Sequence, residues 1–395
     1  MGKRGAAIIG LTEWKSQKRW DKPMFTLEAM AQLTAELLAD TGLAKEEIDG
    51  LCIGPIPESP MFAPAAAAEY LGIGSHFNEK TDLGGASSAG MVMRAAAAIE
   101  AGICDTILCL TPGVPPPRRP DVKPVPRPPY LGADAWGSPQ QFEVPTGLVR
   151  AAPSYALIAS HYMAKHGVRP ETLAKITVQS RQNAADNPLA IFYEKPVTVD
   201  DVLNSKMIVD PLRMLEMVMP VFGGNALLIT SAERAAKARH RPVWISGYGE
   251  YICHKSVPSM PDLVDTPVRH AAARAFKMAG RSHRDMDFLS IYDCFTITVL
   301  LTLEDAGFCA KGEGGRFIEE HDFTRSGDLP LNPHGGQLGF GQQAAGAGGM
   351  SHVTEAVRQI QGRAEHRQLR RADRAWVNGT GGMMSEQVAL ILEGE

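Results

Sequence analysis

The hydrophobic pattern at the start of the chain predicts a strand, a helix and a second strand. Residues 6–11 form a short β-like run, and after Thr26 the apolar positions recur at helical spacing until Gly42. Threonine commonly caps a helix N-terminus, and glycine commonly ends a helix. Residues 48–53, Ile-Asp-Gly-Leu-Cys-Ile, then fit a second strand. This alternation of strand and helix is typical of an α/β protein.

The same pattern returns about 240 residues later, which indicates an internal duplication. A strand at 243–247 and a helix ending at Gly280 precede residues 286–291, which share the apolar-Asp-x-Leu-x-Ile pattern of residues 48–53. A second correspondence joins the helix and strand patterns 90–102 and 106–110 to those at 349–362 and 375–378. A chance likeness between two βαβ units is the simpler alternative, but the shared order favours two copies of one unit.

The repeat divides the chain into an N-terminal half, 1–238, and a C-terminal half, 239–395. Residues 112–129 carry nine prolines interleaved with arginine and lysine, so this stretch is extended and cannot be a central strand. Helical patterns resume before the N-terminal half ends, and residues of about 112–205 are therefore predicted to form an inserted loop domain over the surface of the first half. The proline-rich run is either a solvated linker or a site for an anionic phosphate or an acidic partner.

Composition and charge narrow the class of protein. Hydrophobic residues make up 44% and charged residues 21%, and the net charge of −4 gives no basic field for nucleic acid. Six cysteines without a CxxC pair argue against a zinc site or a disulfide framework. The apolar run near the N-terminus is too short for a signal peptide or a membrane span. The sequence predicts a cytoplasmic protein with no metal site.

Four motifs, in this order, resemble the thiolase superfamily, and in particular its sterol-carrier and lipid-transfer branch. They are Gly84-Gly85-Ala86-Ser87-Ser88, Tyr292-Asp293-Cys294-Phe295, Asn332-Pro333-His334-Gly335-Gly336 with Gly341-Gln342-Gln343, and Asn378-Gly379-Thr380-Gly381-Gly382-Met383. The resemblance implies an α/β thiolase fold, with two duplicated βαβ-rich halves in a five-layer αβαβα arrangement.

The departures from the family pattern concern its reactive groups. By the family's spacing, Gly85 stands at the nucleophilic cysteine, Gln342 at the histidine and Asn378 at the second cysteine. None of these three side chains can attack a thioester or transfer a proton. The chain is therefore not an ordinary thiolase. Ser87, Ser88 or Cys294 could replace the nucleophile, but serines here can also cap the following helix, and Cys294 can be a packed core residue.

The remaining motifs are suited to binding a thioester. A helix that starts near Ser88 offers backbone N–H groups and a positive dipole end, and the glycine-rich loops allow close backbone approach. In the thiolase fold such groups converge on a thioester carbonyl and form oxyanion holes. The residues expected to bind substrate are Gly85, Ser87, Ser88, Gln342, Asn378, Gly379 and Gly381. Coenzyme A is expected as part of the substrate, with no tightly bound cofactor.

Tyr292 is the new polar group in the second motif, and a phenol with a pKa near 10 can exchange a proton with a developing alkoxide. The box resembles that of cysteine-less retro-aldolases of steroid side-chain catabolism, which cleave a β-hydroxyacyl-CoA to a ketone or aldehyde and a shorter acyl-CoA. Asp293 either orients Tyr292 or caps a helix. Tyr251 and His254, with Tyr248 nearby, are candidates for a second acid or base, or are ordinary surface or core residues.

Two other functions stay open: acyltransfer by an atypical nucleophile, and non-catalytic binding of an acyl-CoA or lipid. The resemblance also implies a homodimer joined through the almost wholly apolar strand Thr106 to Leu110. It further implies a small partner, built from a zinc ribbon and an OB-fold, which would come from another gene because this chain has no CxxC pairs.

Overall fold

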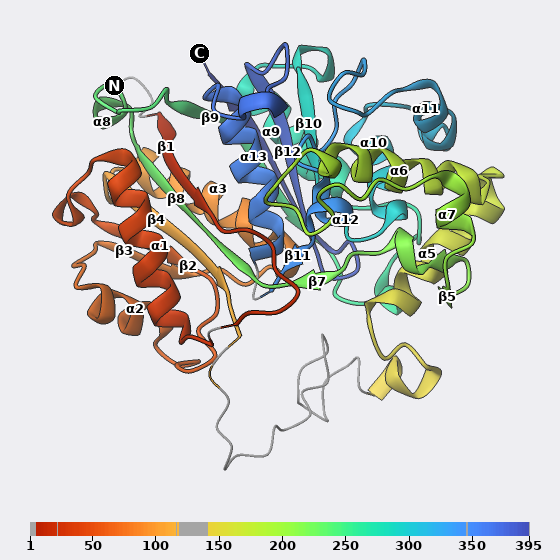
Figure 1. The fold of residues 1–395 in the computed structure, drawn as a ribbon, viewed down its shortest axis with the longest axis horizontal. Helices are drawn as coiled ribbons and strands as arrows, with labels where there is room; N and C mark the ends of the chain where they lie inside the picture. Colours follow the sequence, from red (N-terminus) through yellow and green to blue (C-terminus); the bar gives the residue numbers. More distant parts are fainter. Residues whose placement is uncertain (1–4, 22, 116, 118–140, 345–346, 395) are drawn as a thin grey trace.

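A mixed sheet of nine strands forms the centre of the computed structural model, which describes residues 5–21, 23–115, 117, 141–344 and 347–394 (Figure 1). The strand order is β10-β12-β13-β9-β1-β8-β4-β2-β3. The two halves of the chain meet in the middle, where Ala7 and Ile8 of β1 pair antiparallel with Trp244 and Val243 of β9. One continuous sheet therefore runs through both halves.

Each half repeats the same elements in the same order. The first half has β1 (Ala6–Glu13), α1 (Thr26–Thr41), β2 (Gly50–Ile53), α3 (Ser87–Glu100), β4 (Thr106–Gly113) and β8 (Gly223–Ser231). Their counterparts are β9 (Val243–Ile252), α9 (Val268–Ala279), β10 (Phe288–Ile291), α13 (Met350–Ile360), β12 (Arg374–Gly381) and β13 (Glu386–Glu393). The sheet order β1-β8-β4-β2 matches β9-β13-β12-β10, so the predicted duplication is confirmed.

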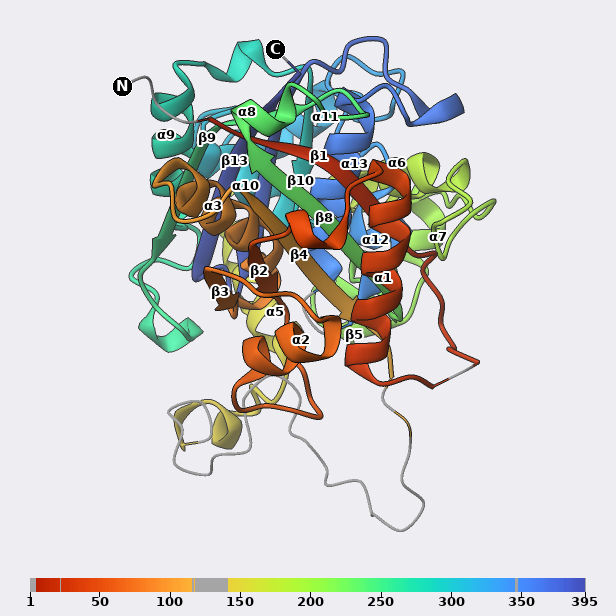
Figure 2. The same ribbon diagram turned by 90° about the vertical axis from the view of Figure 1, so that its left-hand side faces the viewer.

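Three buried clusters separate the helices into layers. α1 and α2 (Ala63–Leu71) cover the outer face of the first half, as Figure 2 shows. α9 and α10 (Thr296–Ala306) cover the outer face of the second half. α3 and α13 lie between the halves, where small side chains such as Ala95, Ala96 and Ala356 let helix and sheet approach closely. The predicted five-layer αβαβα arrangement is confirmed.

The excursion between β4 and β8 contains α5 (Ala151–His166), α6 (Pro170–Ala185) and α7 (Val199–Leu203). Tyr155, Tyr162 and Leu173 of α5 and α6 share a buried cluster with Leu300 and Leu303 of α10. These helices therefore pack on the second half, beside α10 and α11 (Gly314–Glu320) in Figure 1, and not over the first half as predicted. The apolar pattern of these helices does not specify which part of the chain their apolar faces pack against. Most of the proline-rich run lies outside the described residues.

Short elements complete the chain and lead to the site. They are β3 (Phe77–Lys80), β5 (Met207–Val209), β6 (Leu212–Arg213), β7 (Pro220–Val221), α8 (Ala232–Ala235), α12 (Gly336–Phe340) and β11 (Gln342–Gln343). β11 pairs with β7, which brings the third motif beside the end of the excursion.

The prediction that Thr106 to Leu110 joins two subunits is wrong. β4 pairs with β8 on one side and with β2 on the other, so neither of its edges is open. β3 is the edge strand of the first half, and its Asn78, Glu79 and Lys80 are the polar residues typical of an edge. An apolar strand in the centre of a sheet and one at a subunit contact have the same sequence pattern.

Candidate active site

A cavity of about 390 Å³ opens where three of the four motifs meet. Its lining residues are Pro55, Thr81, Asp82, Gly84, Gly85, Ser87, Pro220, Tyr292, Gln342, Gln343, Ala344, Gly348 and Gly349. Of these, Pro55, Thr81, Asp82 and Pro220 had no chemical motif to mark them in the sequence. Asp82 could have been found only as a neighbour of the first glycine pair.

Both helices of the middle layer begin at this cavity. A short 3₁₀ turn, Gly84–Ala86, leads into α3, and a second, Ala347–Gly349, leads into α13. The backbones touch so closely that a Cβ on Gly349 would come within 3.0 Å of the carbonyl oxygen of Gly85. Two helix N-termini thus present backbone N–H groups and positive dipole ends to one space. This arrangement favours an anion or a developing negative charge.

Tyr292 follows directly after β10 and is 3% exposed. Its hydroxyl oxygen accepts a hydrogen bond of 2.9 Å from the side-chain amide of Gln342. A donor aimed at a phenol oxygen stabilises negative charge on that oxygen. The structure therefore brings together the two residues that the second and third motifs contributed, and it pairs them inside the cavity.

Gly85 explains how Tyr292 reaches that position. A Cβ on residue 85 would come within 3.0 Å of both Cζ and the hydroxyl oxygen of Tyr292, and of the carbonyl oxygen of Thr380. The phenol thus fills the space that a side chain at position 85 would need. A nucleophilic side chain at 85 and this placement of Tyr292 exclude each other sterically.

Asp293 is not among the residues that line the cavity, and it holds the start of α12. Its fully buried carboxylate accepts hydrogen bonds from the backbone N–H groups of Gln337, at 2.7 Å, and Leu338, at 3.2 Å. The Nε2 atom of His352, on α13, lies 3.3 Å from Oδ1 of Asp293. Of the two roles expected for Asp293, the geometry shows the helix cap.

The expected second acid or base does not reach the cavity. Tyr251 is 42% exposed and stacks on His270. His254 contacts the carbonyl oxygen of Met383, and burial lowers its pKa. Tyr248 donates to Glu100, and burial, with the charge of Glu100, raises its pKa to about 12. None of the three lines the cavity: Tyr248 and Tyr251 lie on β9, and His254 follows it.

Several residues expected to bind substrate instead have packing roles. Asn378 is buried, and its side chain is hydrogen-bonded to Gln387 and Thr380. A Cβ on Gly379 would press on Ala86 and Ala89, and one on Gly381 would overlap the carbonyl of Leu83. Ser88 is fully buried at the start of α3. Of the predicted binding residues, Gly85, Ser87 and Gln342 line the cavity.

The alternative nucleophiles are not poised to attack. The Ser87 hydroxyl donates to the carbonyl of Gly84 and accepts from the N–H of Leu83, which closes the turn before α3. Cys294 is buried away from the cavity, and desolvation raises its pKa to about 12. No cysteine is among the described lining residues. In the described chain, no group of three or more His, Cys, Asp or Glu side chains could hold a metal ion.

These observations define a thiolase-like fold whose cavity holds a tyrosine in place of the nucleophile. Residues 249–394 match the family model "Thiolase C-terminal domain-like". The chain is 34% identical over 373 residues to the 17-hydroxy-3-oxo-4-pregnene-20-carboxyl-CoA lyase of Mycobacterium tuberculosis, which covers 90% of this chain and 92% of that protein. It is 32% identical over 373 residues to the steroid side-chain-cleaving aldolase of Thermomonospora curvata, with 90% of each chain covered.

A third relative carries a different activity. The acetyl-CoA acetyltransferase of Methanothermobacter thermautotrophicus is 31% identical over 388 residues, covering 96% of this chain and 97% of that protein. Among solved structures, the fold is similar to the "Ltp2-ChsH2(DUF35) aldolase", with a TM-score of 0.86, 29% identity, and 98% of this chain and 97% of that chain covered. The chain belongs to the thiolase superfamily, in its sterol-carrier and lipid-transfer branch.

No helix within the described ranges is long and apolar enough to cross a membrane.

Proposed function

We propose that this chain cleaves a β-hydroxyacyl-CoA by a retro-aldol reaction, giving a ketone or aldehyde and a shorter acyl-CoA. The observation that carries the proposal is the phenol of Tyr292, which fills the space of a side chain at position 85 and accepts a hydrogen bond from Gln342. A site arranged in this way has an acid–base group where a thiolase needs a nucleophile. The reaction it suits needs proton transfer and no covalent intermediate.

The proposed chemistry moves one proton and breaks one bond. Tyr292, as phenolate, takes the proton of the β-hydroxyl, and the β-carbon becomes a carbonyl as the bond between the α- and β-carbons breaks. The electron pair passes into the thioester as an enolate. The helix N-termini of α3 and α13 are suited to stabilise that negative charge. Tyr292 can then return the proton to the α-carbon, so that no proton is consumed overall.

The substrate is proposed to be a steroid- or lipid-like acyl-CoA. Of two relatives that match 90% of this chain, one is named a steroid side-chain-cleaving aldolase and the other a lyase of a pregnene carboxyl-CoA thioester. The named pregnene thioester carries its hydroxyl on C17, which is β to the thioester carbonyl. It is therefore a suitable probe for this chain as well.

Acyltransfer is the second candidate, because the methanogen acetyltransferase matches almost the whole chain. The cavity argues against it, since its described lining contains no thiol and Ser87 is engaged in its own turn. Mass spectrometry of the intact protein after incubation with acetyl-CoA decides between the two. We expect no covalent adduct, and an adduct on Ser87 or Cys294 would establish the acyltransferase mechanism.

We further propose that the chain works as a homodimer with a small zinc-ribbon and OB-fold partner. The similar solved aldolase bears two component names, Ltp2 and ChsH2(DUF35), which supports a second protein at the site. β3 is the edge through which the sheet of one subunit could extend into another. Light scattering of the purified chain at micromolar concentration should give the mass of a dimer, and a monomer would contradict this part of the proposal.

The retro-aldol reaction itself is tested by product analysis, with and without such a partner protein. The pregnene thioester with its C17 hydroxyl should yield a 17-ketone and a shorter acyl-CoA. The same thioester without the hydroxyl is the matched control, and it should be unchanged. Equal consumption of both compounds, or release of free coenzyme A in place of the ketone, would overturn the proposed reaction.

A further inference from the structure

Three consecutive residues at the end of β10 are each held by one segment, residues 332–342. Ile291 is held by Asn332, Tyr292 by Gln342, and Asp293 by the backbone of Gln337 and Leu338. We call this segment the clamp. It contains the third sequence motif except for Gln343, and of that motif Gln342 and Gln343 line the cavity.

At the first contact, the chain around Asn332 pairs with one residue of the edge strand β10. The backbone of residues 330–332 pairs with Leu289, through Leu289 N–H to Pro330 O at 2.9 Å and Asn332 N–H to Leu289 O at 2.8 Å. The side chain of Asn332 then bonds both backbone groups of Ile291. Its Oδ1 accepts from the N–H at 2.8 Å, and its Nδ2 donates to the carbonyl at 2.9 Å. Asn332 is fully buried, so these two bonds are shielded from water.

The second contact fixes the start of α12. Asp293 accepts the N–H groups of Gln337 and Leu338, and Gly336, at a φ of 59°, leaves room for the carboxylate. A Cβ on Gly336 would come within 3.0 Å of both Asp293 Oδ2 and Asn332 Nδ2. The glycine therefore allows Asn332 and Asp293 to lie close to the same turn.

The third contact is the hydrogen bond to the reacting group. α12 begins beside the Asp293 contact and is followed by Gly341, whose N–H donates to the carbonyl of Gln337 at 3.0 Å. The next residue is Gln342, which donates to the Tyr292 hydroxyl and is itself held by its N–H to Met219 O at 2.9 Å. The clamp thus closes a ring: Ile291, Tyr292 and Asp293 on one side, and Asn332, α12 and Gln342 on the other.

We infer that Asn332 is a positioning residue that sets the Tyr292–Gln342 pair through the backbone of Ile291. Only the expected change in kcat depends on the proposed function. Asn332 has no contact with the cavity, so its loss should leave substrate binding unchanged and disturb the placement of the phenol. Loss of a supporting partner of a reacting group, or a displacement of that group by about 1 Å, costs roughly 10- to 100-fold in activity.

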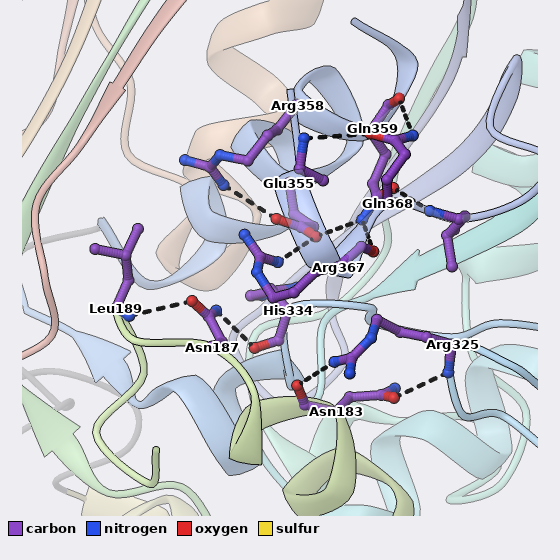
Figure 3. A network of polar contacts seen from close by, with 12 residues as sticks. Asn183, Asn187, Leu189, Arg325, His334, Glu355, Arg358, Gln359, Arg367 and Gln368 are labelled. Carbon is purple, nitrogen blue, oxygen red and sulfur yellow. Dashed lines mark hydrogen bonds and ion pairs between the residues drawn. The ribbon is translucent and has the colours of Figure 1, made fainter. Parts of the chain in front are cut away.

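The test compares Asn332→Ala with Asn183→Ala. Asn183 is the control, because it is also a buried asparagine whose side chain bonds backbone groups of this region, at Phe323, Leu331 and Arg325 and, at 3.4 Å, the carbonyl of Asn332. It forms no described hydrogen bond with residues 291–293, and Figure 3 shows its contacts with Arg325. With 3-fluorotyrosine at position 292, the fluorine resonance reports the surroundings of the phenol independently of activity. Turnover of the pregnene thioester gives kcat and KM separately.

Asn332→Ala should shift or broaden the fluorine resonance and lower kcat about 10- to 100-fold, with KM within about twofold of the wild-type value. Asn183→Ala should leave the resonance and kcat near wild type. An unchanged resonance in Asn332→Ala, or equal effects of the two variants, would overturn the inference. If Asn332→Ala does not fold, Asn332→Ser, which keeps one polar group, should show a weaker form of the same effects. Absence of turnover in the wild type, both with and without the partner protein, would refute the proposed function, and the fluorine spectra would still decide the positioning role.

Discussion

At the scale of single residues, two positions determine what this site can do. Gly85 and Tyr292 come from opposite halves of the chain and occupy one space. A side chain at 85 would displace the phenol, and the phenol leaves no room for a side chain at 85. Restoring a thiolase by Gly85→Cys alone should therefore fail, since the thiol would collide with Tyr292 and no base would stand at Gln342 or Asn378.

The steric coupling of these two residues predicts a non-additive pair of substitutions. Gly85→Ala should destabilise the protein by about 1–3 kcal/mol, because the methyl group overpacks the space of the phenol. In a Tyr292→Ala background the cost should fall by about 1 kcal/mol or more, although the clash with the Thr380 carbonyl remains. Denaturant unfolding of the four proteins measures both costs. Equal costs in the two backgrounds would show that the residues do not share the space.

At the scale of elements, the regular segments were predictable from the sequence, and the position of a strand within the sheet was not. The helix that ends at Gly42 and the strand at 48–53 were expected from periodicity, and α1 ends at Thr41, with Gly42 in the left-handed region, while β2 covers Gly50–Ile53. These segments follow from local chemistry. The position of the strand Thr106 to Leu110 in the centre of the sheet depends on pairing with distant strands, which an apolar pattern alone does not specify.

The candidate site shows the same division. Tyr292 and Gln342 were expected near the substrate because they occupy motif positions, and both line the cavity. Their mutual hydrogen bond, and the clash that excludes a side chain at 85, depend on backbone geometry across the two halves. Tyr251 and His254 were candidates only because their side chains can act as an acid or a base. They do not line the cavity, because a strand end can direct neighbouring side chains to different faces.

The loop before α12 carries a histidine whose burial predicts a pH dependence of stability. His334 is 1% exposed, and burial, with the positive fields of His352, Arg367 and Arg358, holds its pKa well below the ordinary value. Above pH 6.5 this histidine is neutral in both the folded and the unfolded chain. Below that pH the unfolded chain binds a proton that the folded chain does not bind. Stability is therefore lost as the pH falls, by up to about 1.4 kcal/mol per pH unit.

The variant His334→Asn isolates that contribution. Its free energy of unfolding, measured in urea between pH 7.5 and 5, should fall less steeply below pH 6.5 than that of the wild type. The difference in slope should approach that of one proton. Parallel curves for the two proteins would show that His334 titrates alike in the folded and unfolded states.

At the scale of the whole molecule, a buried ionic network joins the two halves. Glu355 on α13 bonds Arg367 at 2.6 Å and Arg358 at 3.0 Å (Figure 3). Arg358 also bonds Glu13 on β1 at 2.9 Å. Burial alone would raise the pKa of Glu355, but the two arginines outweigh it and leave that pKa lowered. The network therefore holds the middle-layer helix of the second half to the first strand of the chain.

Breaking this network should affect the global stability. Glu355→Ala leaves two largely buried guanidinium groups without their shared carboxylate, and such a loss costs about 3–5 kcal/mol. The exposed pair of Arg316 and Glu320 is the matched control, and Glu320→Ala should cost less than about 1 kcal/mol. Chemical denaturation compares them. Similar losses in both variants would show that the buried network does not stabilise the folded chain.

We propose Tyr292 as the proton-transferring group of a site without a nucleophile. The most direct measurement is turnover of the pregnene thioester by Tyr292→Phe, which removes one hydroxyl and keeps the ring that fills the space beside Gly85. This variant should lower kcat about 10²- to 10⁴-fold while the affinity for the CoA thioester is kept. A Tyr292→Phe protein that turns over at the wild-type rate would contradict this proposal.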